Sequence, residues 1–261
     1  VANKNLSTGL TVTGLTASTA AGIAANSKIS SITLTDNTLT ASEYTTSVAS
    51  KNTSTGLVIT GVDVADAATV AASANVNGIT LAATSLSGSQ YTADVASKNA
   101  TPSLTISDVT VSDAASVAAN ANVSSMSLAT TTLTAAQYTT AVASKNTTGS
   151  LTVTGVDINA ALNLAIDRNV SQIHVSSGSS LGSYSASQYA TYKSRIEKIY
   201  QVDGTQLVTV TIAGATASQA ANTLIPDSRV TSLTVSDTTA NIDTYYSQIN
   251  VSKVTQITAT G

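Results

Sequence analysis

Val48-Ala-Ser-Lys-Asn52 is the stretch that decides the fold, because it returns at residues 95–99 and again at residues 142–146. Each recurrence comes 47 residues after the one before. A fixed period of this length indicates a repeat architecture in which each repeat packs on its neighbours. The chain opens on Val1-Ala-Asn-Lys-Asn5, one period earlier, and residues 254–261 have the pattern of another opening strand. We therefore expect a fragment of a longer array.

Each repeat contains two short runs of alternating apolar and polar residues, as in Leu10-Thr-Val-Thr-Gly14 and Ile32-Thr-Leu-Thr35. Such alternation predicts strands with one buried face. The predicted first-half strands are 10–14, 57–61, 104–108 and 151–155, the second-half strands are 32–35, 79–82, 126–129 and 173–176, and three more follow at 210–214, 233–236 and 257–260. Most of them start 22 to 25 residues apart. This spacing leaves room for one helix in each crossover and predicts parallel pairing.

Helix start signals fill the gaps between the strands. Capping boxes open the second-half helices at Thr40-x-x-Glu43, Ser87-x-x-Gln90, Thr134-x-x-Gln137 and Ser185-x-x-Gln188. Leu precedes the first three of these boxes, and Tyr stands at the fourth helical position of all four, which predicts a hydrophobic staple. The first-half helices are expected to start at the N-caps Thr16, Asp63, Thr110, Asp157 and Thr216. Asn52, Asn99 and Asn146 are expected to end the second-half helices in the left-handed conformation, each after a Lys that suits the helix dipole.

These elements predict an α/β fold: an open right-handed solenoid of parallel β-strands and helices, with two coils in each 47-residue β-α-β-α repeat. Right-handed crossovers would place the helices on the apolar side of the sheet. Because strands lie about 4.8 Å apart and helices about 8 Å or more, the stack should curve into a leucine-rich-repeat-like arc. We expect one continuous solenoid in three parts: regular repeats over 1–176, an irregular, lengthened coil over 177–209 and a divergent terminal repeat over 210–261.

Composition excludes several classes of function. Charged residues make up 10% of the chain and its net charge is −3, so the basic surface that nucleic acid binding needs is missing. No apolar run approaches the roughly 18 residues of a membrane span, so we expect no membrane insertion. With no Cys and a single His, the chain offers no thiolate or histidine metal site. We expect no cofactor, and calcium binding has neither the glycine-rich nonapeptide nor the EF-hand loop behind it.

The polar sides of the predicted strands line up as a column of mostly hydroxyl side chains. The candidate ligand residues on this concave face are Thr11, Thr33, Thr80, Thr105, Ser127, Thr152 and His174. A hydroxyl ladder of this kind would suit ice or a polysaccharide. The alternative is that Thr is the β-forming residue that best tolerates water. His174 is expected to be a solvated substitution in this column.

Two further features belong to the irregular coil. Gly178-Ser-Ser-Leu-Gly182 matches the G-x-S-x-G pattern of serine hydrolases, with Ser180 as the nucleophile. The pattern needs a strand-to-helix turn and a later His, whereas the only His precedes it, so we favour chance in a Ser/Gly-rich loop and do not expect an enzyme. Lys193, Arg195 and Lys198 lie on a longer helix. They form either a solvated face or a lateral contact.

Two segments carry a resemblance to known repeats, namely Leu233-Thr-Val-Ser-Asp-Thr-Thr-Ala-Asn-Ile242 and Leu133-Thr-Ala-Ala-Gln-Tyr138. They resemble the repeats of very large secreted or surface proteins of Gram-negative bacteria, which are described as haemolysin-type, adhesin-like or surface-layer-like and often leave by type I secretion. The resemblance covers nearly the whole chain but transfers no functional residue, because the calcium nonapeptides and the secretion signal of those proteins are missing.

The resemblance implies an extracellular or cell-surface location and a structural or adhesive role, as a rigid spacer or display surface. Its expected partners are other segments of the same long protein or copies of itself, as in a surface layer. The alternative is a ligand-binding module that uses the Ser/Thr face to hold ice or a polysaccharide.

Overall fold

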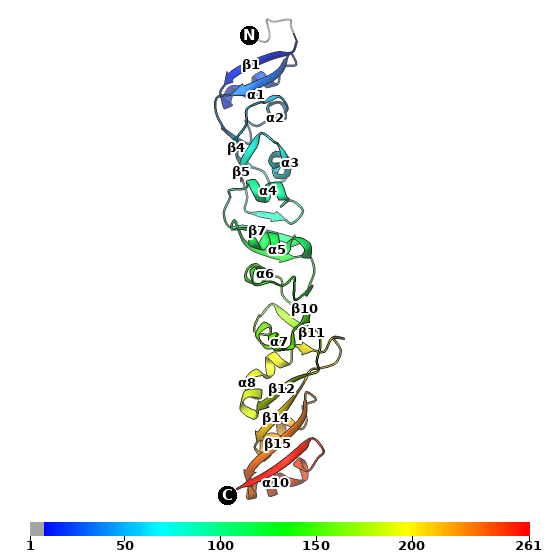
Figure 1. The fold of residues 1–261 in the computed structure, drawn as a ribbon. Helices are drawn as coiled ribbons and strands as arrows, with labels where there is room; N and C mark the ends of the chain where they lie inside the picture. Colours follow the sequence, from blue (N-terminus) through cyan, green and yellow to red (C-terminus); the bar gives the residue numbers. More distant parts are fainter. Residues whose placement is uncertain (1–7) are drawn as a thin grey trace. The chain divides into compact units, whose positions relative to one another are not determined.

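The computed structural model describes residues 8–261, and Figure 1 shows their elements in chain order. The predicted unit tail at Val1–Asn5 therefore lies outside the described residues. The chain divides into two compact modules, which are described separately. The N-terminal module comprises Val1–Thr130 and Thr140–Thr147, and the C-terminal module comprises Thr131–Thr139 and Thr148–Gly261.

The N-terminal module contains the predicted pairs of parallel strands. The pairs are β1 (Leu10–Leu15) with β2 (Ile29–Leu34), β4 (Leu57–Val62) with β5 (Val76–Leu81), and β7 (Leu104–Val109) with β8 (Val123–Leu128). One helix fills each crossover: α1 (Ala17–Ala24), α3 (Ala67–Ala72) and α5 (Val111–Ala119). The prediction of alternating parallel strands and helices is confirmed. Ile32, Ile59 and Ile79 are fully buried on the apolar face of these strands, where helices with small residues such as Ala20 and Ala71 pack against them.

A third short strand in each repeat was not expected. These strands are β3 (Thr38–Thr40), β6 (Ser85–Ser87) and, in the C-terminal module, β9 (Thr132–Thr134), and they pair in parallel with β4, β7 and β10 (Leu151–Val156). Within the described residues the strands form five separate sheets rather than the single sheet expected. In the N-terminal module, only isolated bridges such as Ile32 to Asn52 and Ile79 to Asn99 continue the ladder past β2 and β5. The backbone ladder is therefore interrupted once per repeat.

The second-half helices start later than the capping boxes predict. The Thr40 amide donates to Glu43 Oε2 over 2.8 Å, but the box closes only one turn. The helix α2 (Thr46–Lys51) then starts from a second N-cap, Thr45, whose hydroxyl accepts from the Val48 amide. The extended backbone of Thr45 separates the turn from the helix. The same arrangement precedes α4 (Ala93–Lys98), and α6 (Thr140–Lys145) is equally short. In the first-half helix α3, Asp66 rather than Asp63 is the N-cap.

The prediction of left-handed Asn residues at the ends of these helices is wrong. Asn52 and Asn99 are extended, with φ of −69° and −74°. Both are buried because the side chain closes a small ring: Asn52 Nδ2 donates to Ser54 O, and the Ser54 amide donates to Asn52 Oδ1. This ring takes the place of the left-handed helix ending that was predicted. The chain then runs beside β2, where Asn52 bridges to Ile32.

The left-handed positions lie in the strands instead. Gly61 and Gly155 have φ near +70° and sit where the register shifts by one residue. The predicted strands ended at these glycines, but the extra residue returns the chain to the ladder and places the next side chain, such as that of Val62, in the core. Such a bulge needs a residue that tolerates positive φ, which favours glycine.

The C-terminal module continues the alternation with longer elements. They are β10, α7 (Ile158–Leu164), β11 (Val170–Val175), β12 (Ser180–Ser185), α8 (Ala186–Ile196), β13 (Ile199–Tyr200), β14 (Thr209–Ala215), α9 (Ala217–Gln219) running into a π-helical turn (Ala220–Leu224), β15 (Val230–Thr238), α10 (Thr239–Ile249) and β16 (Val254–Thr260). Their sheets have the orders β13-β11-β10-β9 and β12-β14-β15-β16. Ser185 and Gln188 make the full capping box that was predicted at the start of α8. Within residues 8–261 no helix is long and apolar enough to cross a membrane.

Candidate functional site

The candidate ligand residues do not form the single column that was expected. Thr11 lies opposite Ser31, Thr105 opposite Ser125, and Thr152 opposite Gln172. The candidate residues on the second-half strands therefore lie two positions further along than the residues opposite Thr11, Thr105 and Thr152. On their separate strands, Thr33, Thr80 and Ser127 in the N-terminal module and His174 in the C-terminal module occupy this second position, with Thr154 opposite His174. The prediction was wrong by two residues because each second-half strand starts earlier than its apolar alternation suggested.

Hydroxyl groups in both rows are bonded to the protein itself. The Thr11 and Ser31 hydroxyls lie 2.8 Å apart, and those of Thr105 and Ser125 lie 3.2 Å apart. In the second row, Thr80 Oγ1 accepts from the Gly61 amide over 3.2 Å, and Ser127 Oγ accepts in the same way from the residue at the next bulge. These hydroxyls therefore satisfy backbone groups that the strand bulges leave unpaired.

The prediction that His174 is a solvated substitution is wrong. Its side chain is half-buried, and Nε2 reaches neither solvent nor a hydrogen-bond partner. The ring packs edge-on against Tyr200, with centroids 6.1 Å apart. Here β13 pairs with β11 and places Tyr200 opposite His174, whereas the N-terminal repeats have only an isolated bridge to Asn52, Asn99 or Asn146 at this edge.

Ser180 does not occupy a strand-to-helix turn. It is the first residue of β12, and its hydroxyl accepts from the Gly182 amide over 3.2 Å. The sharp turn that a G-x-S-x-G nucleophile needs is replaced by a strand.

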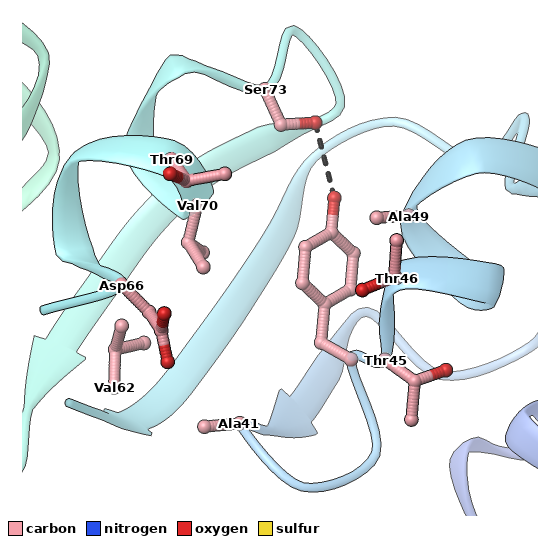
Figure 2. A pocket seen from close by; sticks show the side chains of 10 residues that line it. Ala41, Thr45, Thr46, Ala49, Val62, Asp66, Thr69, Val70 and Ser73 are labelled. Atoms are coloured by element: carbon pink, nitrogen blue, oxygen red, sulfur yellow. Dashed lines mark hydrogen bonds between the residues drawn. The ribbon is translucent and has the colours of Figure 1, made fainter.

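Hollows between successive helices recur with the repeat. In the N-terminal module, a pocket of about 350 Å³ lies between α2 and α3, where the Tyr44 hydroxyl donates to Ser73 Oγ over 3.1 Å. Figure 2 shows Thr46 and Ala49 of α2 on one side of this pocket and Val70 of α3 on the other, and its dashed line marks the hydrogen bond to Ser73. A second pocket, of about 430 Å³, is lined by the residues one period later, including Tyr91.

The hydroxyl groups of the repeat tyrosines differ in their hydrogen bonding. Tyr138 and Tyr189, both in the C-terminal module, donate to Asp167 and Asp227. The Tyr91 hydroxyl is buried without a hydrogen-bond partner, and burial raises the pKa of its phenol. These rings are anchors between coils. Tyr189 is the fourth residue of its helix, as predicted, but Tyr44 and Tyr91 precede the N-caps of α2 and α4, so the staple predicted there is wrong.

A set of lysines that the sequence assigned to the helix dipole ties neighbouring coils together. Lys51 Nζ donates to the carbonyls of Ala24 and Asn26, at 2.7 and 2.9 Å, and therefore caps the preceding helix α1 rather than its own. Lys98 caps α3 in the same way, Lys145 reaches the end of α5, and Lys198 and Lys253 repeat the contact in the C-terminal module. We call these contacts the lysine clamp. Their signal in the sequence is a Lys at one fixed place in every period.

The three basic residues proposed for a lateral contact are largely engaged within the module. Lys198 belongs to the clamp. Lys193 Nζ lies 2.6 Å from Asp227 Oδ2 and 3.1 Å from Glu197 Oε1. Arg195 lies over the Tyr192 ring, 5.5 Å from its centroid. Lys193 is therefore paired with carboxylates of its own module, and one face of the Tyr192 ring contacts Arg195.

The electrostatics at Asp227 follow from these contacts. Burial alone would raise the pKa of the Asp227 carboxyl, but hydrogen bonds from Lys193, Tyr189 and the Arg229 amide outweigh it and hold that pKa below its usual range. The hydrogen bond to Asp227 raises the pKa of Lys193. Burial and the hydrogen bond to Asp227 raise the pKa of Tyr189 to about 12. The group is therefore a structural ion pair across the physiological range.

Among residues 8–261 no group of three or more His, Cys, Asp or Glu side chains could hold a metal ion. Comparisons with protein-family models, curated proteins and solved structures find no match to this chain.

Proposed function

We propose that this chain is a structural or adhesive repeat segment of an extracellular bacterial surface protein, acting as a rigid spacer or display surface. In this proposal the coils continue as a right-handed solenoid with the gentle arc of a leucine-rich-repeat protein. Other segments of the same protein, or copies of the chain, would be its partners. The observation that carries the proposal is the lysine clamp, which uses a charged residue in every repeat to hold one coil on the next.

The lysine clamp supports a role as a stiff spacer rather than as a binding protein. Each lysine is half-buried and, at Lys51, Lys98, Lys198 and Lys253, its ammonium group donates to two carbonyls at a helix end, the second of which also accepts a backbone amide. A hydrogen bond to a charged group contributes about 1.5–3 kcal/mol. Repeating it once in every repeat holds neighbouring coils at a fixed angle, which is what a spacer needs and what a binding protein does not require.

The surface location rests on the resemblance of residues 233–242 and 133–138 to repeats of secreted Gram-negative proteins. The absence of Cys and the low charged fraction of 10% are compatible with that location. Type I secretion would be the export route that the same resemblance implies.

Small-angle X-ray scattering on chains of different repeat number tests the spacer role. One variant duplicates residues 57–103 and another deletes them. A spacer predicts that the maximum dimension rises and falls by the same increment, with an unchanged cross-section. A change in cross-section, or no change in length, would contradict the proposal.

A second candidate function is favoured by one specific observation. Ser85, Thr105 and Ser125 stand opposite one another on β6, β7 and β8, and form a row of three hydroxyl groups on the polar face of one sheet. Such a row would suit ice or a polysaccharide. Replacing Ser85, Thr105 and Ser125 with bulkier Leu residues should leave the length of a spacer unchanged, whereas a loss of ice shaping or polysaccharide retention would promote the ligand-binding module.

A further inference from the structure

A short hairpin follows β13 and has no counterpart in the other repeats. Tyr200 bridges to Leu207 in antiparallel fashion, and the Gln201 amide donates to Gln206 O over 2.8 Å. The tip is held by its own residues, because Asp203 Oδ1 accepts from the amides of Thr205 and Gln206. Val202 is exposed by 68%. We call residues 201–207 the flap, since their regular hydrogen bonds lie within the segment.

The flap closes over His174 through one glycine. Gly204 has φ of +69°, and a methyl group built there would overlap the imidazole carbon Cε1 of His174 and lie 2.8 Å from both ring nitrogens. The backbone of Gly204 therefore rests directly on the imidazole ring. Only glycine fits, because both the positive φ and the close approach exclude a side chain.

The covered side of His174 faces no group that would stabilise a positive charge. Nε2 is buried without a partner. The neighbours in its row are Thr154 on β10 and Tyr200 on β13, both uncharged at neutral pH. The charged group on the far side of Tyr200 is Arg229, 5.7 Å from the ring centroid, and it is a cation. On the flap, Asp203 is occupied by its own turn. Among residues 8–261, His174 has no hydrogen bond or ion pair with a carboxylate.

We propose that the flap is a pH-sensitive cover, closed over neutral His174 and opened when the imidazole takes up a proton. Protonation places an N–H on Nε2, where no acceptor exists, and adds a charge beneath an uncharged backbone. Opening breaks the hydrogen bonds within the flap, from the Gln201 amide to Gln206 O and from the Gly204 amide to Gln201 O, and brings that N–H to water. It also uncovers the His174 ring, which lies between Thr154 and Tyr200 in the sheet. This inference does not depend on the structural role proposed above.

The expected size of the effect follows from the cost of an unpaired donor. Leaving a buried donor unsatisfied costs about 1–3 kcal/mol, and more for a charged group, so closure should weaken by about tenfold or more. Histidine is the side chain that changes charge between about pH 5 and 8. Because the chain has one His, a change in this range that vanishes with His174 is assigned without ambiguity.

Hydrogen exchange of the flap amides tests the proposal on the full chain. After correction for intrinsic exchange rates, protection at Gln201 and Gly204 should fall about tenfold or more between about pH 7.5 and about pH 5. The Val210 amide, which donates to Arg229 O in the same module, should keep its protection and so report that the module stays folded. Equal protection of Gln201 and Gly204 at both pH values would overturn the proposal.

Three variants complete the experiment. His174→Phe keeps a flat ring that cannot be protonated, and His174→Gln serves in case the larger ring disturbs the coil; both should remove the pH dependence. Gly204→Ala should hold the flap open at both pH values. A His174 variant that still loses protection at about pH 5, or a Gly204→Ala chain that stays protected, would show that the His174–Gly204 contact does not control the flap.

Discussion

Single residues at the strand bulges determine whether each coil can close without strain. Gly14, Gly61, Gly155 and Gly214 adopt positive φ at this position, but the third repeat has Asp108 there, with φ of +54°. A non-glycine residue in the left-handed region costs about 1 kcal/mol relative to glycine. The chain accepts this cost because the bulge carries the following side chain, here Val109, into the core.

Replacing Asp108 with glycine should therefore stabilise the protein by about 0.5–1 kcal/mol. The gain comes from relief of backbone strain, since no hydrogen bond of the Asp108 carboxylate holds the bulge. Urea unfolding followed by circular dichroism measures it. The reciprocal change, Gly61→Ala, has open space around the new methyl group and should cost a similar amount. Stabilisation by Gly61→Ala would contradict the argument.

The unpaired Tyr91 hydroxyl gives a second prediction at this scale. Its neighbour Asn120 donates from Nδ2 to Ala96 O and accepts through Oδ1 from the Asn122 amide. In the C-terminal module the same place holds Asp167, whose second carboxylate oxygen accepts from Tyr138. Asn120→Asp should supply that acceptor to Tyr91 but removes the Nδ2 donor to Ala96 O, so we expect a net rise in the free energy of unfolding of about 0.5 kcal/mol or less.

A double-mutant cycle isolates the Tyr91 contribution. In a Tyr91→Phe background, Asn120→Asp should give no gain, because the hydroxyl that would donate is gone. A gain of equal size in that background would assign the effect to the helix end rather than to the new hydrogen bond.

Individual elements depend on contacts from the next coil. The six-residue helices α2, α4 and α6 are shorter than an isolated helix needs in order to form in water. The lysine clamp and the Tyr anchors hold them in place. Lys98→Met should therefore cost about 2 kcal/mol, because it removes the hydrogen bonds to Ala71 O and Ser73 O.

The urea midpoint measures this loss. The matched control is Arg168→Met, which removes an exposed cation and should change stability by less than about 0.5 kcal/mol. A Lys98→Met chain as stable as the control would mean that water satisfies those carbonyls equally well.

The ion pair on α8 gives a pH-dependent prediction. The pKa of Asp227 is below its usual value of 3.8, so its carboxylate stabilises the fold above about pH 4, and this contribution is lost as pH falls through the folded-state pKa. Lys193 has a pKa raised above 10.5, so its contribution is complete at every pH below that value. Asp227→Asn should cost about 1 kcal/mol near neutral pH, a modest figure because Lys193 is partly exposed.

Thermal unfolding of wild type and Asp227→Asn between about pH 2 and about pH 8 measures the difference. The two curves should converge at the acid end, where the wild-type carboxyl is protonated too. A difference that stays constant over this range would assign the loss to packing rather than to charge.

Local patterns predicted the elements, while contacts between coils decided how they end. The alternation around Ile32 and Ile59 identified the strands, and the Ser185 capping box identified α8. Leu39 was predicted to be part of a staple, but three residues with one apolar side chain could not reveal the strand β3. The Asn52 ring and the cover over His174 were also missed. Both depend on segments that return to a strand after 20 or more residues, which no local pattern records.

For the whole molecule, stability should be close to a sum over coils and the contacts between them. Deleting residues 57–103 removes one repeat and joins equivalent positions, so the shortened chain should keep its circular dichroism spectrum and unfold cooperatively. Its denaturant m-value should fall in proportion to the surface removed. Loss of folded structure in the shortened chain would indicate contacts across more than one repeat.

The lysine clamp also has a direction. Each ammonium group reaches back to carbonyls 25 to 33 residues earlier in the chain, so the coil that carries the lysine is held on a coil that was synthesised before it. A nascent chain leaving the ribosome would find its template already complete and could fold at the pace of translation. The Tyr anchors run the other way, from Tyr44 to Ser73 and from Tyr189 to Asp227, 29 and 38 residues later, so each repeat is complete once the next one has been made.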